Sequence, residues 1–127
     1  MPTPFPPTAA SAAAFAAEWV GAWNAHDLEA ILAHYAEDVV FVSPFVTALL
    51  GAEDATVRGR DALREYFARG LAAYPDLHFE LHGALAGAGS VAVHYRSVGG
   101  REAIEAMEIG AAGLVTRVLA HYSEPAA

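Results

Sequence analysis

The chain has 127 residues, of which 55% are hydrophobic, and its fifteen acidic and seven basic residues give a formal net charge of -8. This length fits a single domain that buries roughly two thirds of the surface its unfolded chain would expose. The negative charge repels a phosphate backbone and argues against nucleic acid as a partner, and the absence of cysteine excludes disulfides, thiolate nucleophiles and sulfur-bound metals.

Two features of the sequence bear on its location. No apolar run approaches the ~18 residues that a membrane span needs, so we expect no membrane association. The alanine-rich segment of residues 9–17 lacks basic residues ahead of it and runs directly into Glu18, which is not the pattern of a signal peptide. We therefore expect a cytoplasmic protein.

The first seven residues include four prolines and predict a disordered lead-in to one domain over residues 8–124. Thr8 or Ser11 can cap a first helix. Large apolar side chains then recur at a spacing of four, which predicts that this helix reaches about Trp23.

A second helix and a strand follow. Asp27 is a good N-cap for a helix over residues 28–35. After two acidic residues the pattern changes to β-branched and aromatic residues from Val39 onward, which predicts a strand that Pro44 ends.

The rest of the sequence, after Pro44, predicts a loop, a third helix and four strands. Residues 45–57 are an apolar loop, Arg60 opens the helix and Pro75 ends it. Glycine turns separate the four strand-like runs, which are Leu77–Leu85, Val91–Val98, Arg101–Ile109 and Leu114–Tyr122. Short glycine turns indicate antiparallel neighbours. The order ααβαββββ predicts an α+β fold in which a curved, mostly antiparallel sheet wraps around three helices from the N-terminal half.

Two sequence segments resemble a known family. They are WNAHDLEAILAHYAEDVVFVSP, which begins at Trp23, and VRGRDALREYFARGL, which begins at Val57. With the element order and the closing hairpin, they resemble the nuclear transport factor 2-like superfamily over about residues 12 to 123. The nearest branches are the SnoaL-like polyketide cyclases and the ketosteroid isomerases. The resemblance implies a cone-shaped, cystatin-like α+β barrel with an apolar pocket, dimeric through the outer face of the sheet.

The catalytic residues of these relatives carry over only in part. Trp19 stands where the isomerase has a tyrosine that hydrogen-bonds the enolate, and Ser43 stands at the position of its general base. Glu105 matches the protonated aspartate of the isomerase. The epoxide hydrolases of the superfamily have an aspartate on the last strand, where this chain has Ala120.

Glu105 is therefore the first candidate for chemistry, and the hairpin turn before it, at Gly99 and Gly100, decides which residues are its neighbours. A two-residue turn at Gly99 and Gly100 would pair His94 with Glu105 and place His94, Arg96 and Glu105 on one face, in the cavity. Glu105 would then be the acid or base, with His94 or Arg96 as its partner. A one-residue change in register would turn His94 and Arg96 outward, and the three could also form an internal ion pair without a function.

The cavity walls supply the predicted ligand-binding residues, which are Trp19, Trp23, Tyr35, Phe41, Ser43, Tyr66, Phe67, Met107, Val118 and Tyr122.

A metal site is a weaker candidate. His78, Glu80 and His82 alternate along one strand and share a face, and two histidines with a carboxylate are a known ligand set. Three such residues span about 13 Å, however, which is too far to share one ion. We predict neither a metal nor a cofactor.

Two functions remain open. The first is a cofactor-independent enzyme that uses acid/base chemistry on a small lipophilic substrate. The second is a non-catalytic protein that binds a hydrophobic ligand, favoured by the missing base at Ser43. A third, weaker idea is a dimeric assembly module that uses Val93, Tyr95 and Ile104 on the outer face of the sheet.

Overall fold

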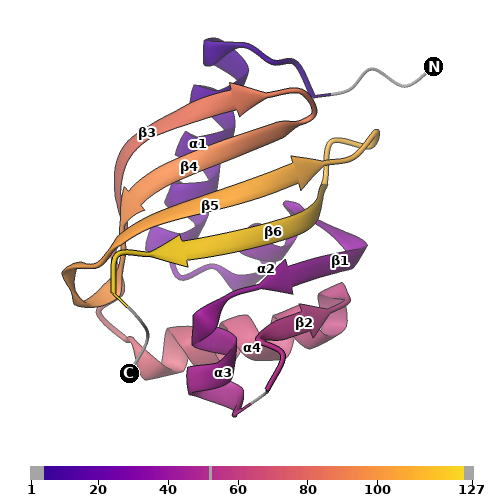
Figure 1. Ribbon diagram of the computed structural model, residues 1–127. Coiled ribbons are helices and arrows are strands. Elements are labelled where there is room, and N and C mark those ends of the chain that lie inside the picture. The colour runs from indigo at the N-terminus through magenta and orange to yellow at the C-terminus, as the bar shows by residue number, and fades with distance from the viewer. Residues whose placement is uncertain (1–4, 52, 125–127) are drawn as a thin grey trace.

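The computed structural model describes residues 5–51 and 53–124. Within them the chain forms four α-helices, one short 3-10 turn and six strands (Figure 1). The helices are α1 (Ala9–Asn24), α2 (Leu28–Leu32), α3 (Pro44–Leu50) and α4 (Arg60–Ala73), and the turn is η1 (Val98–Gly100). The strands are β1 (Tyr35–Val42), β2 (Thr56–Arg58), β3 (Glu80–Gly87), β4 (Ser90–Arg96), β5 (Glu102–Ile109) and β6 (Val115–Tyr122).

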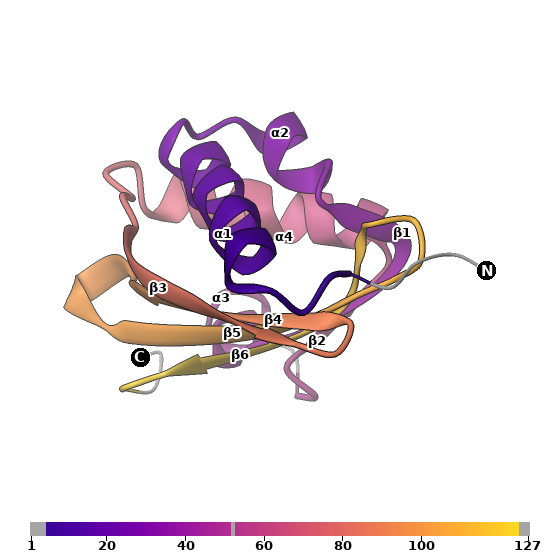
Figure 2. The same ribbon diagram turned by 90° about the horizontal axis from the view of Figure 1, so that it is seen from above.

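The strands form one curved sheet in the order β2-β1-β6-β5-β4-β3, which does not close on itself. All neighbours are antiparallel except β1 and β6, which run parallel. Helices α1, α2 and α4 lie on one face of the sheet, and none of the helices in the described residues covers the opposite face of β3 to β6 (Figure 2). The predicted α+β class, with a mostly antiparallel sheet around helices, is confirmed. We call the face toward the helices the inner face and the other the outer face.

The helix starts follow the predicted signals. Thr8 caps α1 and forms a capping box with Ser11, and the side chain of Asp27 accepts a hydrogen bond from the backbone of Ala30 at the start of α2. Residues 1–4 of the predicted lead-in lie outside the described residues, while the ring of Phe5 packs edge-on against Phe15.

The structure differs from the prediction between Pro44 and Arg58, where the sequence suggested only a loop. Ser43 and Pro44 end the strand, but they also begin helix α3, because Ser43 is its N-cap and proline suits the first helical position. Gly51 ends α3 with a positive φ of 69°, a conformation that glycine adopts without a steric cost. The three residues of β2 then pair with β1 at the edge of the sheet.

The predicted register of the β4–β5 hairpin is wrong by one residue. Five residues, 97–101, connect the strands, and the backbone N–H of Ser97 donates to the carbonyl of Arg101. The pairs are therefore Val93 with Glu105 and His94 with Ile104, instead of His94 with Glu105. Because side chains alternate along a strand, this single step sends His94 to the outer face.

The described residues contain no helix long and apolar enough to cross a membrane.

Candidate functional site

A cavity lies between the inner face of the sheet and helices α3 and α4. Its volume is about 60 Å³, which suits a ligand of a few heavy atoms or a small group of waters, since one water needs roughly 10–15 Å³ measured in this way. Aromatic side chains form most of its wall. The lining residues are Trp23, Phe41, Phe45, Leu49, Tyr66, Phe67, Gly70, Tyr74, Leu77, Phe79, Tyr95, Ser97, Val98, Glu105 and Tyr122.

Among the described residues that line the cavity, Glu105 is the only acidic one. It projects from the inner face of β5, between Val93 of β4 and Ala120 of β6, and is only 4% exposed. Burial in this apolar wall raises the pKa of the Glu105 carboxyl to about 7, against a smaller lowering by a hydrogen bond from Tyr95. The group therefore takes up and releases a proton close to neutral pH.

The two oxygens of Glu105 have different surroundings. The hydroxyl of Tyr95 donates a hydrogen bond to Oε2. Oε1 is buried and has no hydrogen-bond partner among the described residues. Because a buried polar atom without a partner is costly, Oε1 is the atom for which a bound water or ligand would matter most.

Tyrosines surround this carboxyl. Burial raises the pKa of the Tyr66 and Tyr122 hydroxyls, and the nearby charge of Glu105 raises it further. Burial likewise raises the pKa of Tyr95 well above its ordinary value, with Glu105 again adding to the effect. These hydroxyls consequently stay protonated at neutral pH and remain available as hydrogen-bond donors.

The predicted ligand-binding residues fall into two groups. Trp23, Phe41, Tyr66, Phe67 and Tyr122 line the cavity together with Glu105. The other five are buried but absent from the lining; they are Trp19, Tyr35, Ser43, Met107 and Val118.

Two of this second group have structural contacts that explain their position. The indole N–H of Trp19 donates to the Tyr35 hydroxyl at 2.9 Å, within the core. Ser43 accepts a hydrogen bond from the backbone N–H of Phe45 at 3.2 Å, so its hydroxyl caps α3. Neither Ser43 nor Trp19 supplies an acid or base to the cavity.

The predicted grouping of His94 and Arg96 with Glu105 is wrong. Both side chains lie on the outer face, where they contact Glu102. The register error explains the misplacement, since it exchanged the two faces of β4. The same error assigned Val93 and Tyr95 to the outer face, although both are buried on the inner face.

Sequence reasoning therefore missed Tyr95, whose hydroxyl hydrogen-bonds Glu105. A signal for it existed. Val91, Val93 and Tyr95 form the apolar half of β4, whereas His94 and Arg96 form the polar half. Apolar alternation predicts which half faces a core and would have placed Tyr95 inside. The contribution of Phe45 and Leu49 had no such signal, because α3 was expected to be a loop.

Comparisons with known proteins agree with the fold. A sequence model of the SnoaL-like domain family matches residues 16–123. A SnoaL-like protein of unknown function from Burkholderia thailandensis is 44% identical, with a TM-score of 0.89 over 94% of this chain and 99% of that one. A candidate ketosteroid isomerase from Kribbella flavida is 24% identical, with a TM-score of 0.66 over 91% of this chain and 79% of that one, and it shows the shared fold alone. No relative was found among the curated proteins.

Proposed function

The chain belongs to the SnoaL-like domain family, and from this premise we propose that it is an enzyme whose buried Glu105 exchanges a proton with a small lipophilic substrate. The observation that carries the proposal is the raised pKa of Glu105. This carboxyl is buried in an apolar cavity, and its pKa is about 7. A general acid or base works best when its pKa lies near the operating pH. No cofactor is part of this proposal.

The chemistry follows from the two oxygens of Glu105. Tyr95 holds Oε2, so Oε1 is the atom that would give a proton to, or accept one from, the substrate. Protonated Glu105 can donate to a carbonyl oxygen, and its ionised form can remove an acidic proton next to that carbonyl. Because the wall is aromatic and the cavity is small, the fitting substrate is a compact, carbonyl-bearing apolar molecule. A polycyclic substrate would need the walls to move apart.

The experiment measures deuterium exchange next to the carbonyl of small cyclic ketones in D₂O by NMR. We expect exchange above the buffer rate with the wild-type protein, and a loss of at least about 100-fold in Glu105→Gln, since general acid–base catalysis contributes about 10²–10⁴-fold. Glu102→Gln is the matched control, because Glu102 lies on the same strand but faces outward. Equal exchange in the Glu105→Gln and wild-type proteins would overturn the proposal.

A non-catalytic ligand-binding protein is the second candidate, favoured by one observation. The position where the isomerases carry their base holds Ser43, whose hydroxyl caps a helix. In this case the ketones would shift the NMR signals of Trp23 and Phe67 without any exchange. Glu105→Gln would then change only their affinity.

We further propose that the protein forms a homodimer through its outer sheet face. The pairings align Leu85, Ala92, Ala106 and Leu119 in one apolar row across four strands. Leu85, Ile104 and Leu119 are exposed there, and such contiguous apolar surface marks interaction sites. Sedimentation should show a wild-type dimer and a Leu119→Lys monomer. A monomeric wild-type protein would contradict this proposal.

The cytoplasmic location stays a prediction.

A further inference from the structure

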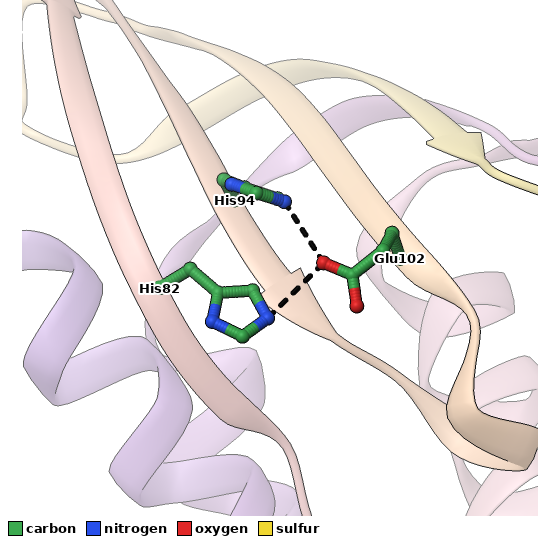
Figure 3. Close-up of side chains that lie close together, drawn as sticks. All are labelled: His82, His94 and Glu102. Carbon is green, nitrogen blue, oxygen red and sulfur yellow. Dashed lines mark hydrogen bonds and ion pairs between the residues drawn. The ribbon is translucent and has the colours of Figure 1, made fainter.

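Three side chains with metal-binding atoms converge on the outer face, away from Glu105. They are His82 of β3, His94 of β4 and Glu102 of β5 (Figure 3). They come from three neighbouring strands, whereas the set considered from the sequence ran along one strand. Their convergence therefore depends on sheet register, which the spacing of His78, Glu80 and His82 could not reveal.

The backbone brings these residues together by a β-bulge. Leu81 pairs with Tyr95 and Gly83 pairs with His94, so His82 is the extra residue of β3 at this point. Bulges redirect side chains and are frequent at functional sites. Here His82 is turned toward His94, and their ring centroids are 4.8 Å apart.

The distances fit a shared ion. Nε2 of His82 lies 3.1 Å, and Nε2 of His94 lies 3.0 Å, from Oε1 of Glu102. All three ligand atoms lie within 4.8 Å of one another. In a tetrahedral zinc site with bonds of about 2.0–2.1 Å, neighbouring ligand atoms are about 3.3 Å apart. A rotation of the imidazoles would thus admit an ion between the three ligand atoms.

The surrounding charges leave the ligand atoms available. Arg96 donates to the other oxygen of Glu102, Oε2, and also to Glu80, each at 3.3 Å. Arg96 therefore orients the carboxylate while Oε1 stays directed at the histidines, as outer-shell partners do in metal sites. The side chains of His82, His94 and Glu102 are 27%, 47% and 42% exposed, so an ion can reach them from solvent.

We propose that His82, His94 and Glu102 form a binding site for a divalent transition metal, with Zn²⁺ as the ion that best fits two imidazoles and one carboxylate. Three protein ligands leave a fourth tetrahedral position for water or for a group from another molecule. The site is separate from the Glu105 cavity, and its existence does not depend on the proposed enzymatic function.

The test is a Zn²⁺ titration of protein without a purification tag, followed by calorimetry near neutral pH. We expect one ion per chain, and a loss of affinity of at least about tenfold in His82→Ala and in His94→Ala, since even outer-shell changes cost 10–100-fold. His121→Ala is the control, because His121 lies on the same face but outside the cluster. Its affinity should match that of the wild-type protein.

A second measurement keeps the test decisive if an alanine variant folds poorly. Co²⁺ bound to the wild-type protein should give the visible absorption of a low-coordinate site, and Glu102→Gln should weaken that signal. No saturable binding to the wild-type protein would overturn the proposal. So would a His121→Ala protein that loses as much affinity as the His82 and His94 variants.

Discussion

Two carboxylates on one strand have opposite protonation behaviour. Glu105 and Glu102 both belong to β5, but their odd separation puts them on opposite faces. Burial raises the pKa of Glu105 to about 7. Partial desolvation alone would raise the pKa of Glu102, but hydrogen bonds from Arg96 and His94 outweigh it, so the pKa of Glu102 is lowered. The same chemical group thus titrates near neutral pH on one face and is an anion at neutral pH on the other.

The difference shows that the two faces differ in what they can bind. The inner face is buried and largely aromatic, so it favours the uncharged form of an acid and an apolar ligand. The outer face carries rows of charged and imidazole groups that stay in contact with solvent. These charged groups favour cations and polar partners, whereas the row of Leu85, Ala92, Ala106 and Leu119 on the same face is apolar.

The largest effect is expected from packing. Met107 is fully buried on the inner face of β5, while Ile104 is exposed on its outer face. Met107→Ala should lower the free energy of unfolding by roughly 2–5 kcal/mol, because it leaves a cavity in the core. Ile104→Ala should cost about 1 kcal/mol or less, as surface changes do. Urea unfolding measures both, and equal losses would mean that the two faces are not packed differently.

The next effect is the pH-dependent stability that the raised pKa of Glu105 produces. Its pKa is raised from 4.5 in the unfolded chain to about 7, so the folded state binds the proton more tightly. The stabilisation is complete below pH 4.5 and is lost as the pH rises through 7. Glu105→Gln should remove this loss and be more stable than the wild-type protein by about 3 kcal/mol above pH ~8.

Urea unfolding at a series of pH values checks this prediction. The two proteins should converge in stability at acidic pH, where Glu105 is protonated in both states. Glu102→Gln is again the matched control and should keep the wild-type slope between the two pKa values of Glu105. A wild-type stability that stays flat across that interval would show that Glu105 is not desolvated.

A smaller effect is expected from Tyr95→Phe. The Tyr95 hydroxyl donates to Glu105 and lowers its pKa, so its removal should move that pKa above 7. The free energy of unfolding should fall by about 1 kcal/mol, the usual contribution of one hydrogen bond. An NMR titration of the Glu105 carboxyl carbon measures the pKa. A downward shift would contradict the hydrogen bond as the cause.

The sequence predicted the elements better than their contacts. Capping residues such as Thr8 and Asp27 marked helix starts correctly, because their signal is local. Helix α3 was missed because Ser43 and Pro44 serve both to end a strand and to begin a helix. The register of β4 and β5 was missed because glycines locate a turn without giving its length.

The residues of the candidate site were likewise predicted better than the contacts between them. Glu105 was found through the family resemblance, and five of the aromatic wall residues followed from periodicity. Tyr95 was lost with the register, although the apolar alternation around Val93 could have corrected it. The grouping of His82 with His94 and Glu102 could not be predicted, since it depends on a bulge that shifts one strand against the next.

The smallest effect tests whether Glu102 is only a surface anion or also a metal ligand. Because the pKa of Glu102 is lowered, its contribution to stability is present above pH 4.5 and is lost as the pH falls through the lowered value. With a chelator present, Glu102→Gln should therefore lower the thermal midpoint only slightly at neutral pH and not at all in acid. Added Zn²⁺ should widen this gap at neutral pH, because an ion that binds only the folded state stabilises it by mass action. If Zn²⁺ raises the midpoints of both proteins equally, Glu102 is an ordinary surface anion and the ion binds elsewhere.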